Sequence, residues 1–371
     1  MPLRPRRNIC KLPKAIHGGK YYAHLDGLGI SPEDILDFSV SHNPYGPPQS
    51  VVLALKSVPI DSYPDPEVKE LRNRLGEILG VKSENLLVGS GSTELIRLVT
   101  MAYFDRGDRV LIPQPTYGEY EIACRIMGAK TIRQPILKEE NHFRLDIADL
   151  LSCIKKFKPK GVFLCNPNNP TGQCLSRDDI EKALLSAPDC LFIIDEAYIA
   201  FTESEDSFSS LGLMNHDNIV VIRSMTKEYA LAGLRLGYAV ATAKIIKLLK
   251  LACPPWNVNI AAHLAGIAAL DSKNYLEDCK AKINQAKSFL MSELSTMGLA
   301  TIPSQANFFL VKVGSARDFH RALLKKGFLV RDCSSFGLSE YIRIAPRTMP
   351  ECIRFITAVR KIMTERQNNN I

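Results

Sequence analysis

Three short apolar runs constrain the fold of this chain more than any other feature. They read "GVFLC", "LFIID" and "NIVVI" and lie at residues 161–165, 191–195 and 218–222. Each run is apolar almost throughout, as expected for strands that are covered on both faces in a mainly parallel sheet. Helical patterns such as "RDDIEKALLSA" lie between them and can supply the crossovers. The sequence therefore predicts an α/β fold.

Other segments extend this pattern and suggest a second domain. "NLLVGSGS" reads as a strand with a glycine turn, "TELIRLVTMAYF" as a helix and "RVLIP" as a strand. After about residue 256 come long helical segments and two strand-like runs, "ANFFLVKV" and "YIRIAP". With 371 residues, 46% of them hydrophobic, the chain can form a large core and a smaller one. We predict a large domain over 47–255 and a small α+β domain from 1–46 and 256–371.

Composition excludes several classes of protein. The ten cysteines are irregularly spaced without a CxxC pair, so we expect free cysteines, no zinc site and a reducing cytoplasmic location. No apolar run is long enough to span a membrane, and the start lacks the apolar core of a signal peptide. The net charge of +8 suits anionic small substrates. The first 14 residues hold five basic and no acidic side chains, but nothing resembles a nucleic-acid-binding module. We expect neither a nucleic-acid nor a membrane partner.

Polar side chains follow each of the three central strands. Asn166 follows the first, Asp195 ends the second, and Ser224, Thr226 and Lys227 follow the third. Ligands of open parallel sheets bind in the crevice at the carboxyl ends of the strands. Separate caps and turns could explain each residue singly. Together, a buried carboxylate, ammonium and amide would be costly without a ligand or partners.

A second segment indicates a phosphate site. In "VGSGSTELI" (88–96), Ser92 and Thr93 stand where a strand turns into a helix, and a helix N-terminus attracts anions. The chain has neither a P-loop nor a dinucleotide fingerprint at this turn, so a nucleotide is not favoured. Pyridoxal 5'-phosphate (PLP) combines one phosphate, one carbonyl and a basic ring nitrogen. It needs a lysine for a Schiff base and a carboxylate for the ring nitrogen, and Lys227 and Asp195 fit these roles.

The motifs "NPNNPTG" (166–172), "DEAY" (195–198) and "SMTKEYALAGLRLGY" (224–238) resemble those of fold-type-I PLP enzymes of the aspartate aminotransferase superfamily. The resemblance extends from about residue 17 to 360. It implies that Lys227 is the aldimine lysine and proton shuttle, and that Asp195 pairs with the pyridinium nitrogen. The ring contacts that it implies are Asn166 and Tyr198 on the 3-hydroxyl and Tyr117 stacked on the ring. The phosphate contacts that it implies are Ser92, Thr93, Ser224, Thr226 and Arg235.

The same resemblance implies a homodimer, because Tyr63 in "SYPDPE" matches a tyrosine that reaches the cofactor phosphate of the neighbouring subunit. Arg343 in "YIRIAP" matches the arginine that binds the substrate carboxylate, a task that suits the guanidinium fork. Arg223 gains no role and is interpreted as a solvated charge.

Two branches of the superfamily compete for this chain. "IHGGK" (16–20), "DFSVSHNPYGPP" (37–48) and "VRDCSSFGLSEYIRIAPR" (330–347) resemble L-threonine-O-3-phosphate decarboxylase of the cobalamin pathway. That resemblance implies that Arg331 and Arg343 bind the anionic groups of a phosphorylated amino acid. His17, Gly18 and Asn43 then line the substrate phosphate site.

The sequence-based prediction is therefore decarboxylation of L-threonine O-3-phosphate or L-serine O-phosphate to an amino-alcohol phosphate for the cobamide nucleotide loop. The alternative is an aminotransferase of the histidinol-phosphate type, in which the same arginines bind the substrate phosphate and a keto acid in turn. A non-catalytic binding protein that uses the basic N-terminal segment is a third, weaker hypothesis, because the catalytic set is complete.

Overall fold

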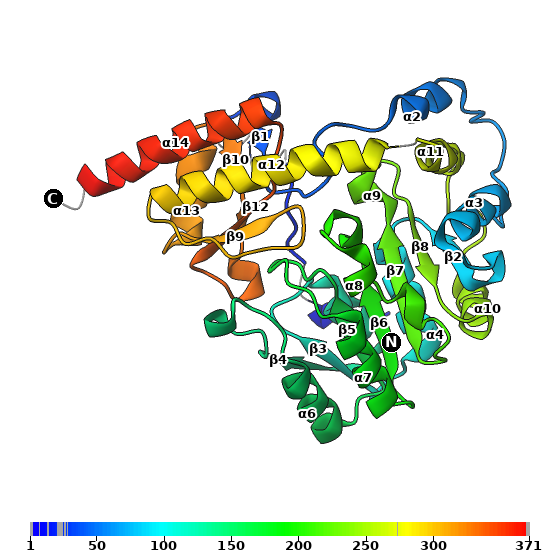
Figure 1. Ribbon diagram of the computed structural model, residues 1–371. Helices are drawn as coiled ribbons and strands as arrows, with labels where there is room; N and C mark the ends of the chain where they lie inside the picture. The colour runs from blue at the N-terminus through cyan, green and yellow to red at the C-terminus, as the bar shows by residue number, and fades with distance from the viewer. Residues whose placement is uncertain are drawn as a thin grey trace.

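The computed structural model describes residues 3–6, 8–12, 15–20, 25, 27, 29–272 and 274–368. Its centre is a seven-stranded sheet in the order β2-β8-β7-β6-β5-β3-β4 (Figure 1). All neighbours in the sheet are parallel except β8, which is antiparallel to both β2 and β7. The strands are β2 (Leu86–Gly89), β3 (Arg109–Pro113), β4 (Lys130–Gln134), β5 (Gly161–Cys165), β6 (Leu191–Asp195), β7 (Ile219–Ser224) and β8 (Gly237–Val240). The predicted α/β fold with a mainly parallel sheet is confirmed.

Helices cover both faces of this sheet, which explains why its central strands are apolar on both sides. Phe163 and Ile193 point into one core, while Val162 and Ile194 point into the other, as the two-residue repeat of a strand requires. The first core is completed by α4 (Ser92–Tyr103), α5 (Glu119–Met127) and α10 (Ala243–Ala252). The second is completed by α3 (Lys69–Leu79), α6 (Ile147–Phe157), α7 (Arg177–Ser186) and α11 (Ile260–Leu270).

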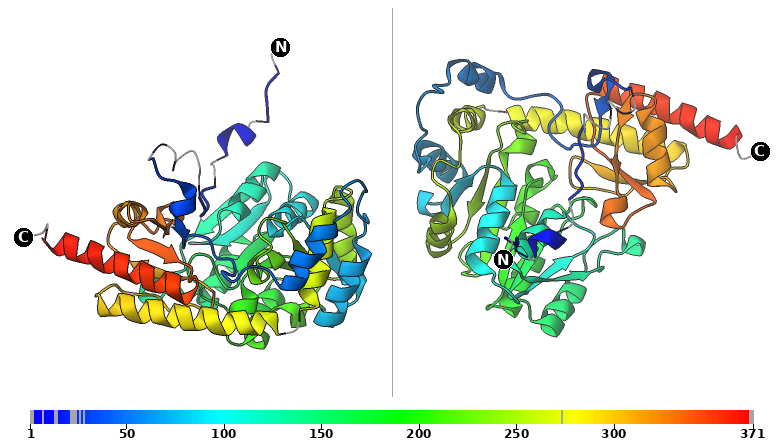
Figure 2. Two further views of the ribbon diagram at one scale, coloured as in Figure 1. Left: turned by 90° about the horizontal axis from the view of Figure 1, so that it is seen from above. Right: turned by 180° about the vertical axis from the view of Figure 1, so that it is seen from behind.

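The C-terminal part builds a separate, smaller core around Phe38, Phe319 and Phe355. Its three-stranded antiparallel sheet has the order β11-β12-β9, and β1 pairs in parallel with β10. These strands are β1 (Leu36–Asp37), β9 (Phe309–Lys312), β10 (Phe328–Leu329), β11 (Arg331–Asp332) and β12 (Tyr341–Ile344). The helices are α12 (Tyr275–Thr296), α13 (Ala316–Leu324) and α14 (Met349–Asn368), with α12 and α14 lying along each other (Figure 2).

Helix α11 lies beyond the predicted boundary at residue 255, yet it shares the core of the large sheet. Its small residues Ala262, Ala265 and Ala269 are fully buried there, next to α3 and the short helix α2 (Gln49–Ala54). Helix α12 then runs from this region to the small sheet (Figure 1). The domain boundaries themselves stay a prediction.

No helix within the described ranges combines the length and the apolar character that crossing a membrane requires.

Candidate active site

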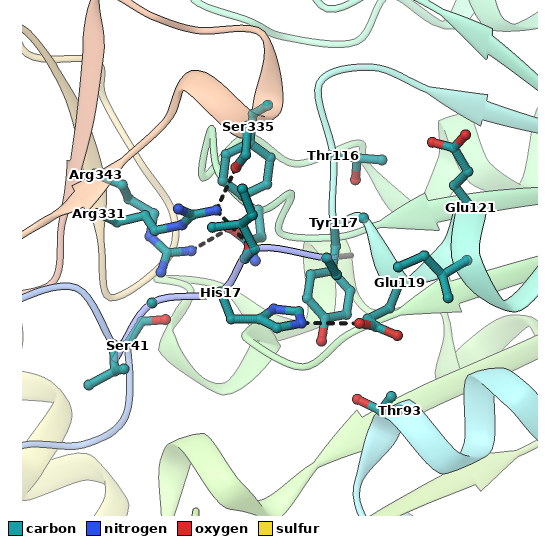
Figure 3. A pocket seen from close by; sticks show the side chains of 18 of the residues that line it. His17, Ser41, Thr93, Thr116, Tyr117, Glu119, Glu121, Arg331, Ser335 and Arg343 are labelled. Atoms are coloured by element: carbon teal, nitrogen blue, oxygen red, sulfur yellow. Dashed lines mark hydrogen bonds and ion pairs between the residues drawn. The ribbon is translucent and has the colours of Figure 1, made fainter. Parts of the chain in front are cut away.

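A cleft of about 630 Å³ lies where the carboxyl ends of the large sheet face the small domain. Its walls come from the N-terminal segment, the starts of α4 and α5, and the strands of the small sheet (Figure 3). Nine of the residues that the sequence predicted for the site line this cleft: His17, Gly18, Thr93, Tyr117, Tyr198, Lys227, Arg235, Arg331 and Arg343. The fold of both sheets and the N-terminal segment thus brings the predicted groups together, although they lie up to 326 residues apart.

Lys227 stands on a helix of a single turn, α9 (Met225–Glu228), directly after β7. Ser224 caps this helix: its hydroxyl accepts a bond from the Thr226 N–H at 3.3 Å and lies 2.6 Å from the Thr226 hydroxyl. The Lys227 ammonium lies 5.8 Å from the centre of the Tyr198 ring. The Tyr198 hydroxyl in turn lies 3.0 Å from that of Ser41.

The start of α4 and the Arg235 guanidinium form an anion site. Gly91 precedes this helix with φ of 80°, a conformation that favours glycine. A Cβ at this position would lie 2.7 Å from Nη2 of Arg235, so glycine is required for the guanidinium to approach the helix start. The unpaired N–H groups of a helix N-terminus and an arginine beside them are suited to a phosphate. Ser92 and Thr93 are the first two residues of the helix.

Asp195 is a buried carboxylate at the end of β6, with only 3% of its surface exposed. Burial raises its pKa, whereas the Tyr120 hydroxyl, the Ala197 N–H and the charge of Lys227 lower that pKa. Tyr120 donates to Oδ2 at 2.7 Å and Ala197 donates to Oδ1 at 3.0 Å. These donors favour the charged form that pairing with a protonated ring nitrogen needs.

Tyr120 is a site residue that the sequence reasoning missed. It is fully buried and stacks on Phe163 with ring centres 4.8 Å apart. The signal was available in "PTYGEY", because Tyr120 follows Tyr117 at helical spacing at the start of α5. The rings of these two tyrosines meet edge to face at 5.5 Å.

The prediction for Asn166 needs correction. All hydrogen bonds of its side-chain amide are to backbone atoms: it donates to the carbonyls of Leu175 and Phe208 and accepts from the Leu175 N–H. Asn169, three residues later in the same motif, lines the cleft instead. The motif folds back on itself after β5, so its first asparagine holds the loop and a later one faces the ligand space.

Asn43 and Tyr63 also lie outside the lining of the cleft. Asn43 is fully buried and bonds to the backbone carbonyls of Lys227 and Glu228, so it does not line the predicted substrate phosphate site. Tyr63 is 80% exposed, and its ring lies tilted against that of Trp256 with ring centres 4.6 Å apart.

Arg331 and Arg343 form one wall of the cleft (Figure 3). They stand opposite each other on the antiparallel strands β11 and β12. Arg331 donates to the carbonyl of Ile16 at 2.7 Å and to the Ser335 hydroxyl at 2.6 Å. Arg343 donates to the carbonyl of Ser39 at 2.8 Å and also bonds to the Asn169 side chain.

The Arg343 guanidinium has the features of an anion-binding group. It is 5% exposed, its Nε has no hydrogen-bond partner, and among the described residues no carboxylate pairs with it. A buried cation is stable only with a partner, so an anionic ligand group would complete this wall.

His17 faces the arginine wall from the N-terminal segment. Its Nε2 lies 3.0 Å from Oε1 of Glu119, and its ring lies 5.8 Å from that of Tyr117. Glu119 also lies 3.6 Å from the guanidinium of Arg97. The His17 contact is the largest cause that lowers the pKa of Glu119, so a carboxylate orients the imidazole.

The prediction that Arg223 is a solvated charge is wrong. Its side chain is buried and pairs with Glu196 at 2.9 Å and with Glu205 at 2.7 Å. Glu196 also accepts bonds from Ser209 and Ser210. This network fixes the segment after Asp195 to β7, and therefore fixes the strand ends that carry the site.

The residues present fit PLP. A buried carboxylate at a strand end, a lysine 5.8 Å from the Tyr198 ring and a phosphate cradle at α4 match the three polar parts of that cofactor. The doubly covered sheet and this donor set define the class of fold-type-I PLP-dependent enzymes.

The family described as aminotransferase class I and II has a model that matches residues 33–359. The histidinol-phosphate aminotransferase of Moorella thermoacetica is 34% identical over 342 residues, which cover 91% of this chain and 87% of that protein. The histidinol-phosphate aminotransferase of Methanocaldococcus jannaschii is 34% identical over 367 residues, which cover 96% of this chain and 97% of that protein. The chain therefore belongs to the aminotransferase class I and II family and is a PLP-dependent enzyme.

Solved structures give the same assignment. The histidinol-phosphate aminotransferase of Clostridium acetobutylicum matches with a TM-score of 0.81 and 29% identity, covering 89% of this chain and 100% of that chain. L-threonine-O-3-phosphate decarboxylase from Porphyromonas gingivalis matches with a TM-score of 0.77 and 28% identity, with the same coverage of 89% and 100%. Both branches that the sequence suggested thus occur among the structural neighbours.

Replacing Tyr120 by phenylalanine tests its bond to Asp195. A hydrogen bond to a charged group contributes about 1.5–3 kcal/mol, so we expect Tyr120→Phe to weaken PLP binding about ten- to a hundredfold. Titration of the cofactor-free protein with PLP measures this affinity. Tyr103→Phe is the matched control, since that tyrosine packs against the same apolar core. Equal affinities in both variants would contradict the role of Tyr120.

Glu228, next to Lys227, gives a pH-dependent prediction. Burial raises its pKa from 4.5 to about 8, while Arg223 lowers this pKa and Glu205 raises it. The folded state thus binds the proton more tightly than the unfolded chain, and the free energy of unfolding falls as the pH rises from about 4.5 to 8.

We expect Glu228→Gln to be more stable than the wild type by about 1–2 kcal/mol at pH 8 and nearly equal to it at pH 5. Urea unfolding of the cofactor-free protein at both pH values measures the difference. The exposed Glu277, changed to glutamine, is the control. A difference that is the same at both pH values would refute the prediction.

Proposed function

We propose that this enzyme is an aminotransferase that acts on histidinol phosphate or a similar phosphorylated amine. The support is twofold. The relatives described above, at 34% identity, are named histidinol-phosphate aminotransferases. The observation that carries the proposal is the pair of buried guanidiniums, Arg331 and Arg343, on one wall of the cleft. An aminotransferase of this type must bind a phosphorylated amine and then a dicarboxylic keto acid in the same site. Paired arginines suit both ligands.

In the proposed reaction, different side chains bind the cofactor, move the proton and orient the substrate. Lys227 would hold the cofactor covalently, release it to the amino substrate, and carry the proton to and from the substrate Cα. Asp195 would hold the ring nitrogen protonated, which Tyr120 supports through its hydroxyl. PLP when bound supplies an electron sink for the bonds to the substrate Cα. Arg343 would orient the substrate by an anionic group, so that the Cα–H bond stands perpendicular to the ring.

Decarboxylation of a phosphorylated amino acid is the second candidate. It is favoured by the segment "RDCSSFGL", which places Ser335 against Arg331, and by His17, which lines the cleft. A decarboxylase would hold the carboxylate, in place of the hydrogen, perpendicular to the ring. Asn43 does not join His17 at the cleft, so one part of the phosphate site expected for this branch is absent among the described lining residues.

A parallel substrate panel distinguishes the two reactions. With L-histidinol phosphate and 2-oxoglutarate, we expect the PLP-loaded enzyme to form glutamate without releasing CO2. CO2 from L-threonine O-3-phosphate or L-serine O-phosphate, formed without a keto acid, would overturn the aminotransferase proposal in favour of the decarboxylase.

The same panel tests the arginine wall. Arg331→Lys keeps the positive charge but loses the two parallel hydrogen bonds that a guanidinium can donate to a phosphate. We therefore expect KM for the phosphorylated substrate to rise about ten- to a hundredfold. Arg354→Lys, at an exposed position outside the cleft lining, is the control and should leave KM unchanged. A KM that is unchanged in Arg331→Lys would contradict the role of this arginine.

We also propose that the enzyme is a homodimer in which Tyr63 completes the partner's site. Tyr63 and Ile60 are 80% and 90% exposed, and Tyr63 does not line the cleft of its own chain. The Trp256 ring, which is 46% exposed, lies 4.6 Å from the Tyr63 ring, so these two rings form an exposed apolar surface that a second copy of the chain would cover.

Subunit mixing tests this arrangement. We expect Lys227→Ala to be inactive and Tyr63→Phe to be weakened about tenfold or more, because the phosphate loses a hydrogen bond. Coexpressed in one dimer, the two variants should regain activity, because one of the two sites then has both Lys227 and the partner's Tyr63. Failure to exceed the activity of the Tyr63 variant, or a solution mass of one 41.3 kDa chain, would reject the proposal.

A further inference from the structure

Helix α9, which carries Lys227, is too short to supply hydrogen-bond partners for all of its own backbone carbonyls. It has four residues, Met225–Glu228, and the carbonyls in the last turn of a helix have no partner within the helix. A single turn is also too short to be stable by itself. The segment directly after it leaves the helical conformation, since Ala230 has φ of 55°. The position of Lys227 must therefore be fixed by other parts of the chain.

Asn43 supplies the missing partners from 184 residues away. Its backbone N–H donates to the carbonyl of Lys227 at 2.8 Å, and its side-chain Nδ2 donates to the carbonyl of Glu228 at 3.0 Å. It thus caps two successive carbonyls at the end of α9. Such capping is usually provided by residues that follow a helix in sequence.

Asn43 is itself held in place from the other side. Nδ2 also donates to the Tyr275 hydroxyl at 3.0 Å, and Oδ1 accepts the N–H of Tyr45 at 3.0 Å. With an exposed fraction of 0%, every hydrogen-bonding group of this side chain is used. Tyr275 begins α12, bonds to the carbonyl of Gly46 and stacks on Tyr229 with ring centres 6.2 Å apart. Figure 1 shows α9 beneath this end of α12.

We propose that Asn43 is a positioning residue, which acts through the backbone of α9 to hold Lys227 at the distance and angle that its bond to the cofactor requires. Asn43 is not among the residues that line the cleft, and its side chain bonds to Glu228, Tyr275 and Tyr45, so it acts through Lys227 and not on the substrate. The proposal rests on Lys227 as the cofactor lysine and is independent of which reaction follows. A shift of about 1 Å in a reacting group can reduce a rate a hundredfold, so the position of this helix is expected to matter.

The test compares Asn43→Ala with Asn218→Ala. Asn218 uses the same chemistry, since its Nδ2 donates to the carbonyls of Leu184 and Ala187 at the end of α7 at 3.2 Å each. It precedes β7, whereas Lys227 follows that strand, so it lies at the opposite edge of the sheet from the cleft. Asn43→Ala loses three side-chain hydrogen bonds, to Glu228, Tyr275 and Tyr45, and keeps its backbone bond to Lys227. Asn218→Ala loses two side-chain hydrogen bonds, and both variants are expected to melt at a lower temperature. Tyr275→Phe, which leaves Asn43 in place but removes its hydroxyl partner, is a milder second variant.

Two measurements separate positioning from stability. In the PLP-loaded enzyme, we expect the pH midpoint of the visible absorbance of the bound cofactor to shift by about 1 unit in Asn43→Ala, and in the same direction in Tyr275→Phe. In the cofactor-free protein, we expect hydrogen exchange over residues 225–231 to increase about tenfold in Asn43→Ala. Asn218→Ala should change neither. We also expect kcat to fall about ten- to a hundredfold with a smaller change in KM.

Borohydride reduction and peptide mapping keep the possible failures apart. Label on Lys227 with an unchanged absorbance midpoint and unchanged exchange in Asn43→Ala would overturn the positioning role alone. Label on another lysine would overturn the assignment of Lys227, and the positioning role with it. Equal shifts in Asn43→Ala and Asn218→Ala would show a general loss of stability and would also overturn the proposal.

Discussion

The parallel pairing of β5, β6 and β7 is the constraint on which the rest of the structure depends. Because the strands run in one direction, their carboxyl ends meet at one edge, and Cys165 stands beside Asp195 in the register. The residues just beyond that edge therefore become neighbours whatever their distance in sequence. The buried pair of Arg223 and Glu196 fastens the segment after β6 to β7 and keeps this edge in place.

The charge of Asp195 shows how the surroundings serve the site. Burial alone would favour its neutral form, and a neutral carboxyl could not pair with a protonated ring nitrogen. The Tyr120 hydroxyl and the Ala197 N–H counteract part of this effect of burial on the pKa of Asp195. On the other side of the cleft, Arg343 is held by the carbonyl of Ser39 and by the uncharged side chain of Asn169, and no carboxylate among the described residues pairs with it. The cleft thus has a buried carboxylate at one end and two arginines on the opposite wall, which is the arrangement that the proposed function uses.

Much of this could be predicted from the sequence, and the failures have a common cause. The strands at 161–165 and 191–195, the turn between β2 and α4 and the place of Lys227 after β7 follow from local patterns and motifs. Asn166 and Asn43 were predicted to contact ligands, but the side-chain amides of both donate to backbone carbonyls. Arg223 was interpreted as solvated and is buried. In each case the direction in which the side chain points depends on segments far away in the sequence.

The sequence by itself determined the class of cofactor, through motifs that place a lysine, a carboxylate and a glycine-serine turn at the ends of apolar strands. These features are local, because a strand and its terminal residue are encoded within about ten positions. The tertiary structure alone decided that Asn169 and not Asn166 faces the cleft, that Tyr120 bonds to Asp195, and that Asn43 caps α9. The physical reason is that each buried polar group takes whichever partner the folded chain brings within hydrogen-bonding distance.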